Sequence, residues 1–114
     1  MWNKAEIYRA LAGADAPLLG PELARFAAEP LGPWRTAQLE VLCRRAQEYL
    51  DTPLPALPYR LFCRYWETGD REGWQEPYFE RRGRLLVFSL LLWLAPENPG
   101  WPAWREALED TVWA

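Results

Sequence analysis

The stretch PYFERRGRLLVFSLLLWL, residues 77–94, decides the fold class. It starts with charged residues and becomes almost wholly apolar from Leu85, interrupted only by Ser89. The apolar run ends at Ala95, so it is far shorter than the roughly 20 residues that a membrane span needs. The stretch therefore predicts a helix from about Pro77 to Leu94 that is buried among other helices.

The residue mix of the whole chain favours the same class. Leu and Ala, which favour helices, are abundant, whereas the β-branched residues Val and Ile are rare. The chain has 114 residues, of which 50% are hydrophobic, and this is enough for one domain with a core. We expect an all-α fold in which residues 1–114 form a single helical domain of stacked antiparallel helical hairpins.

Pro and Gly residues divide the rest of the chain into further expected helices. Their ranges are 2–12, 21–29, 34–50, 59–68 and 102–114. Gly69 is the expected C-cap of the fourth helix, and Gly83 inside the fifth indicates close approach by another helix. In the helix over 34–50, the expected inward face consists of Trp34, Ala37, Val41, Leu42, Ala46 and Tyr49.

Charge and composition exclude several function classes. The 13 basic and 16 acidic residues give a net charge of -3, which argues against a nucleic-acid partner. The chain has no His, the commonest general base and metal ligand. We therefore expect no metal and no cofactor.

The two cysteines, Cys43 and Cys63, do not form a disulfide framework. We expect buried free thiols, although a bridge between neighbouring helices stays open. The N-terminal residues lack the apolar run and cleavage site of a signal peptide. We expect a cytoplasmic location and no membrane association.

Three stretches carry a resemblance to a known family. They are LFCRYWETGDR at 61–71, PYFERRGRL at 77–85 and ALEDTVWA at 107–114. Together they resemble the N-terminal part of bacterial heparinase II/III-like proteins, over residues 39–114. The family resemblance implies an α/α-toroid followed by a β-sandwich, so this chain would form an incomplete α/α-toroid without the sandwich.

The resemblance also implies an activity. Characterised members of the family are polysaccharide lyases that cleave uronate-containing glycans by β-elimination, using Asn, Tyr and His residues. Neither Asn3 nor Asn98 matches a catalytic motif of the family, so we assign no catalytic residue here. The chain alone is expected to be inactive, and an acidic polysaccharide would be a partner of the complete protein.

Four side chains are candidates for contact with such a glycan. Arg81 and Arg82 lie in a basic cluster that suits a carboxylate or sulfate, whereas Trp74 and Tyr78 suit stacking on sugar rings. The alternatives are a structural ion-pair network that includes Glu80 and Arg84, and an aromatic staple at the helix start. The carboxylates of Glu106, Glu109 and Asp110 are expected to be solvated on a helix surface.

A second function class also fits the sequence. A helix as apolar as residues 85–94 needs neighbours on all sides, and six helices of this length do not supply enough of them. The chain is then a small helical protein-interaction module whose exposed apolar face binds a partner or a second copy.

Overall fold

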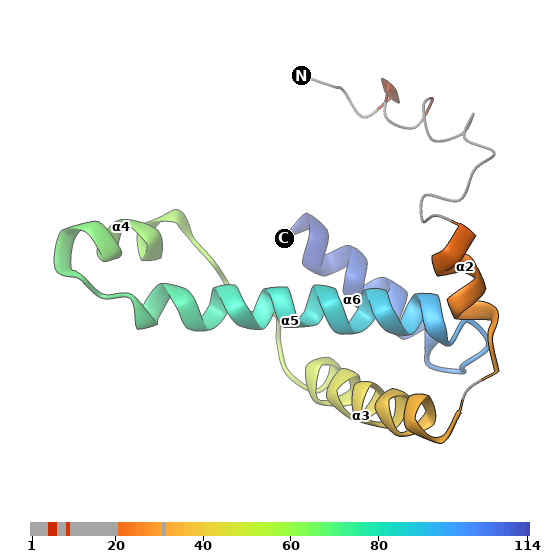
Figure 1. Ribbon diagram of the computed structural model, residues 1–114. Coiled ribbons are helices and arrows are strands. Elements are labelled where there is room, and N and C mark those ends of the chain that lie inside the picture. Colours follow the sequence, from red (N-terminus) through yellow and green to blue (C-terminus); the bar gives the residue numbers. More distant parts are fainter. Residues whose placement is uncertain (1–4, 7–8, 10–20, 31) are drawn as a thin grey trace. The chain divides into compact units, whose positions relative to one another are not determined.

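The computed structural model describes residues 5–6, 9, 21–30 and 32–114, and every regular element in them is a helix (Figure 1). The helices are α2 (Pro21–Ala28), α3 (Pro33–Leu50), α4 (Tyr59–Thr68), α5 (Glu72–Leu94) and α6 (Trp101–Trp113). The predicted all-α class is confirmed for these residues. The helix expected over 2–12 lies for the most part outside the described residues.

The chain divides into two compact units, Met1–Pro30 and Leu31–Ala114. The described part of the first unit contains α2, which starts at Pro21. Proline suits a first helical position because the N–H that it lacks would have had no partner there.

The second unit is organised around α5, which packs against α6 and α3 and also contacts α4. Figure 1 shows α4 beside the first turns of α5. The buried apolar core consists of Ala46, Tyr49, Val87, Phe88, Leu91 and Trp104, which come from α3, α5 and α6. Phe88 and Leu91 are fully buried, so the C-terminal half of α5 forms the centre of the core.

The start of α5 differs from the prediction. The helix begins at Glu72, not near Pro77, and Pro77 lies inside it. The carboxylate of Asp70 accepts a hydrogen bond from the backbone N–H of Gly73 at 3.1 Å, which anchors the first turn earlier in the chain. Pro77 is the sixth residue of α5, so the helix lacks the backbone bond that an N–H at this position would have donated to the Gly73 carbonyl. The other helix boundaries agree with the prediction to within one residue.

The predicted inward face of α3 is partly wrong. Trp34 is 71% exposed and Val41 is 52% exposed, and Ala37 is exposed as well. Val41 lies five positions before the buried Ala46, and this spacing turns it about 140° away around the helix. The face that packs on the core consists of Leu39, Leu42, Cys43, Ala46 and Tyr49.

The apolar half of α5 is also less enclosed than expected. Val87, Phe88 and Leu91 are buried, but Leu86 is 60% exposed and Ser89 is exposed. The helix therefore keeps one face on the surface, because its neighbours cover only part of its circumference. None of the helices in the described part of the chain is long and apolar enough to cross a membrane.

Two glycines fulfil the expected roles. Gly69 caps α4 with a left-handed φ of 74°, which L-residues with a side chain rarely adopt. At Gly83, a Cβ atom would lie 2.5 Å from the Tyr49 hydroxyl oxygen. The predicted close approach of another helix is thus confirmed, and that helix is α3.

Candidate functional site

Arg84 is the most deeply buried charged side chain of the described residues, at 4% exposure. Its guanidinium donates to the carbonyl oxygen of Tyr49 at 2.9 Å and to that of Pro53 at 2.9 Å. It also bonds the carbonyl and the hydroxyl oxygen of Thr52, the latter at 2.8 Å. The last carbonyls of a helix lack partners within it and carry partial negative charge. Arg84 of α5 therefore caps the C-terminal end of α3.

Glu80 completes this arrangement on α5. Its carboxylate forms an ion pair with Arg84 at 2.8 Å, one turn along the same helix. The Arg84 guanidinium also lies 5.0 Å from the centre of the Tyr49 ring. The structural ion-pair network, one of the two alternatives for the basic cluster, is therefore present.

Arg81 is half-buried and contacts two other segments. It donates to the carbonyl oxygen of Pro55 at 3.1 Å and to that of Thr111 at 3.5 Å. Pro55 belongs to the connector after α3, and Thr111 is buried in the last turns of α6. Arg81 therefore links α5 to the connector and to α6, and two backbone carbonyls accept hydrogen bonds from its guanidinium.

Arg82 lies on the surface. Its guanidinium reaches the hydroxyl oxygen of Tyr78 at 3.4 Å and lies 5.6 Å from the centre of the Tyr78 ring. The three arginines that form one cluster in the sequence therefore have three separate environments. Only Arg82 keeps its charge exposed to solvent.

Trp74 and Tyr78 contact each other. Their rings are stacked with centres 4.7 Å apart and an angle of 17° between planes. Trp74 also meets Phe62 of α4 edge-on at 5.5 Å. Trp74 therefore holds α4 against the first turns of α5, as the staple alternative expects, and Tyr78 supports the Trp74 ring by stacking on it; contact with a sugar stays a prediction.

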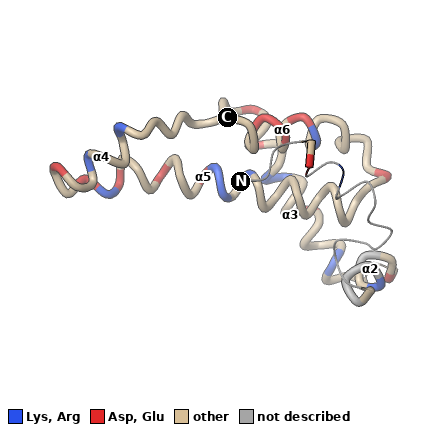
Figure 2. The backbone as a smooth tube through the Cα atoms, turned by 90° about the horizontal axis from the view of Figure 1, so that it is seen from above, with Lys and Arg blue, Asp and Glu red and all other residues tan. Residues whose placement is uncertain are grey.

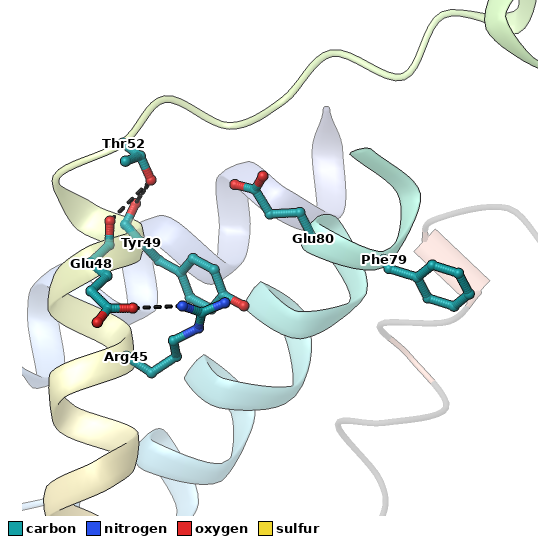
Figure 3. A pocket seen from close by; sticks show the side chains of 6 residues that line it. All are labelled: Arg45, Glu48, Tyr49, Thr52, Phe79 and Glu80. Carbon is teal, nitrogen blue, oxygen red and sulfur yellow. Dashed lines mark hydrogen bonds and ion pairs between the residues drawn. The ribbon is translucent and has the colours of Figure 1, made fainter. Parts of the chain in front are cut away.

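One hollow in the second unit was not predicted from the sequence (Figure 3). It has a volume of about 550 Å³ and is lined by Arg45, Glu48, Tyr49, Thr52, Phe79 and Glu80. Its lining comes from α3, α5 and the connector, so no local motif marks it. Arg45 and Glu48 form an ion pair of 2.6 Å at its edge, and the hydrogen bond that Arg45 donates to the Glu48 carboxylate raises the pKa of Arg45.

The remaining candidates lie apart from these arginines. Glu106, Glu109 and Asp110 are exposed on α6, as predicted, and Figure 2 shows the acidic residues along that helix. Cys43 and Cys63 are both free and half-buried. Burial, with a smaller effect of Glu40, raises the pKa of the Cys43 thiol.

Metal-binding groups and known relatives add no further assignment. The described residues contain no group of three or more His, Cys, Asp or Glu side chains that could hold a metal ion. No protein-family model, no curated protein and no solved structure matches the chain. The function is therefore argued from the sequence resemblance and from the geometry of the second unit.

Proposed function

We propose that the chain is the N-terminal helical part of a heparinase II/III-like protein and that it begins an α/α-toroid of stacked helical hairpins. One observation carries the proposal. The stretch PYFERRGRL, which carries the resemblance, supplies Arg81 and Arg84, and these residues bind the C-terminal parts of α6 and α3. The stretch PYFERRGRL thus joins α5 to α3 and α6, and we expect such a role from a stretch that belongs to a helical scaffold.

The outer surface of these helices supports the same proposal. Large apolar side chains are exposed on α5 and α6, among them Leu86 at 60%, Val112 at 58% and Trp113 at 73%. Exposed apolar groups of this size are typical of a surface that another element covers. Further helical hairpins of a complete toroid are the covering elements that we propose.

The proposed activity belongs to the complete protein. β-Elimination on a uronate needs a group that neutralises the carboxylate, a base for the ring proton and an acid for the leaving oxygen. Arg81 and Arg84 are engaged with backbone carbonyls in this chain. We therefore assign the catalytic groups to other parts of the protein, and to this chain at most a contact of Arg82, Trp74 or Tyr78 with an acidic glycan.

The coding DNA downstream of codon 114 provides the direct test. Our proposal expects the reading frame to continue through further amphipathic helices into a β-rich segment. A reading frame that closes directly after this codon, with no such segment encoded beyond it, would contradict the proposal.

A turnover assay tests the assignment of activity. The purified 114-residue chain is incubated with heparin, heparan sulfate or alginate, and the unsaturated uronate product is followed by its near-ultraviolet absorbance. We expect no product. Measurable elimination by this chain alone would show that it carries an active site.

A second candidate function is a helical protein-interaction module. Tyr59 is 78% exposed and Trp66 is 74% exposed, and both lie on α4. This candidate expects concentration-dependent self-association or partner binding that is lost when both side chains are changed to Ser. A sedimentation profile that is identical for the wild-type chain and this double variant would argue against it.

A further inference from the structure

We propose that a small hollow between α4 and α5 binds a single ring that carries a carboxylate, such as an acidic sugar unit or an aromatic acid. The hollow has a volume of about 170 Å³ and is lined by Phe62, Tyr65, Arg71, Trp74 and Gln75. Pockets for drug-sized ligands are larger, at about 300–1,000 Å³. The volume therefore suits one ring.

Three aromatic side chains form the apolar wall of the hollow. Phe62 and Tyr65 lie one turn apart on α4, and Trp74 comes from the first turn of α5. The rings of Phe62 and Trp74 meet at an angle of 62°, with centres 5.5 Å apart. Trp74 is held in turn by its stack on Tyr78, so the wall exists before any ligand binds. Aromatic walls favour a ligand with a flat or ring-shaped apolar face.

The charge at the hollow is positive. The guanidinium of Arg71 lies 5.6 Å from the centre of the Tyr65 ring. The neighbouring carboxylate of Asp70 is engaged with Arg64 at 3.0 Å and with the Gly73 N–H. Within the described part of the chain, no carboxylate pairs with Arg71. Its planar fork of donors is therefore available for an anion and matches a carboxylate.

Gln75 adds a neutral polar group. Its side-chain amide has no hydrogen-bond partner among the described residues, and it can donate to or accept from a ring substituent. The hollow thus combines an apolar wall, one unpaired cation and one free amide. A cationic ligand would be repelled by Arg71, and a neutral ring would gain only the wall, so a ring with a carboxylate uses all three groups.

Nuclear magnetic resonance titration of the full 114-residue chain tests this proposal. The indole N–H signal of Trp74, assigned through Trp74→Phe, is followed while glucuronate or benzoate is added. Glucose and benzyl alcohol are the matched neutral rings. We expect a saturable shift with at least one acid and about tenfold weaker binding of its neutral counterpart.

Two arginine variants make the test specific. Arg71→Gln is expected to weaken binding of the acid about tenfold or more. Arg60→Gln removes the same charge from an exposed position on α4 outside the hollow, and it should leave binding nearly unchanged. Circular dichroism confirms that each variant keeps its helices. Added salt should weaken binding of the acid to the wild-type chain but not that of the neutral ring, which gives a second readout if Arg71→Gln unfolds.

The outcomes separate the ligand sources. A response to glucuronate alone assigns the hollow to an acidic sugar, and a response to benzoate alone assigns it to an aromatic acid. The proposal is overturned if neither acid shifts the Trp74 signal, if the neutral rings bind as tightly, or if Arg60→Gln weakens binding as much as Arg71→Gln. This titration is independent of the reading-frame and turnover tests. The ligand proposal for the hollow can therefore be refuted without refuting the proposed function, and the reverse also holds.

Discussion

The contact between Gly83 and Tyr49 sets how closely α3 and α5 approach. A Cβ atom at position 83 would lie 2.5 Å from the hydroxyl oxygen of Tyr49 but 3.5 Å from the ring carbon that bears it. The Tyr49 ring is 8% exposed, and Phe88, Arg45 and Arg84 contact it. These contacts keep the ring from moving away. The close contact with an added Cβ atom comes from the hydroxyl oxygen, because the ring carbon lies at an ordinary distance.

This contact predicts that the effect of Gly83→Ala changes sign with the residue at position 49. In the wild-type background, overpacking should lower the free energy of unfolding by about 1–2 kcal/mol. In the Tyr49→Phe background the hydroxyl is absent. The helix propensity of Ala should then raise the free energy of unfolding by up to about 1 kcal/mol. Urea unfolding of the four proteins of this cycle measures both effects. Equal effects of Ala in the two backgrounds would show that the hydroxyl does not limit the approach.

Cys43 gives a prediction about pH. Burial and the Glu40 carboxylate raise the pKa of its thiol, so little thiolate is present in mildly alkaline solution and alkylation by iodoacetamide should be slow. Because the pKa is higher in the folded state than in the unfolded state, the thiol favours folding at lower pH. This contribution is lost as the pH rises through the raised pKa.

The measurement is the alkylation rate of Cys43 against pH, in a Cys63→Ser background. Its inflection should lie above that of a short unfolded peptide that contains the same cysteine. Glu40→Gln should move the inflection part of the way back. An inflection at or below that of the peptide would refute the burial effect.

The corner between α4 and α5 is the local feature that fixes the start of the long helix. Gly69 has a left-handed φ of 74°, and a Cβ atom there would meet nothing within 4 Å. Asp70 then accepts the hydrogen bond of Gly73 N–H and pairs with Arg64. The corner thus depends on the backbone conformation of Gly69 and on the hydrogen bond and ion pair of the Asp70 carboxylate.

Gly69→Ala should therefore destabilise the chain through its backbone angle alone. We expect a loss of about 1–2 kcal/mol in the free energy of unfolding. Gly69→Asn is the matched control, because Asn tolerates this conformation better, and its loss should be smaller. Chemical unfolding of the two variants compares them directly, and equal losses would show that the left-handed angle is not the cause.

At the scale of the elements, the sequence predicts those helix ends that are set by residues close by in the chain. Gly69 ends α4, and the prolines before and after α3 limit that helix, because these residues act on their own backbone. The start of α5 is missed because Pro77 suits a first helical position, whereas the carboxylate of Asp70 anchors the helix earlier. A proline alone does not show which of the first turns it occupies.

The arginine environments illustrate what the sequence does not show. Arg81, Arg82 and Arg84 are close in the sequence, but each residue of a helix is turned about 100° from the one before. The backbone carbonyls that Arg81 and Arg84 bind lie in α3, α6 and the connector, 26 to 35 residues away. Such contacts depend on the packing of helices, so the local pattern shows only that the basic cluster exists.

At the scale of the whole molecule, the second unit combines a small apolar core with buried polar links between helices. Among its described residues, six apolar ones are buried, from α3, α5 and α6. Arg84 links α5 to the end of α3 through the Tyr49 carbonyl and to the following connector through the Pro53 carbonyl, and Arg81 links α5 to α6. If these links hold the helices together, the two buried or half-buried arginines should stabilise the unit, and the exposed Arg82 should not.

Urea unfolding of Arg84→Met beside Arg82→Met measures this most directly. Removal of Arg84 takes the guanidinium donor away from the buried Tyr49 carbonyl and from the half-buried Thr52 and Pro53 carbonyls, and it removes the ion-pair partner of Glu80. We expect the free energy of unfolding to fall by about 2–4 kcal/mol in Arg84→Met. In Arg82→Met it should change by less than about 0.5 kcal/mol. Equal and small effects in both variants would contradict a structural role for the PYFERRGRL stretch.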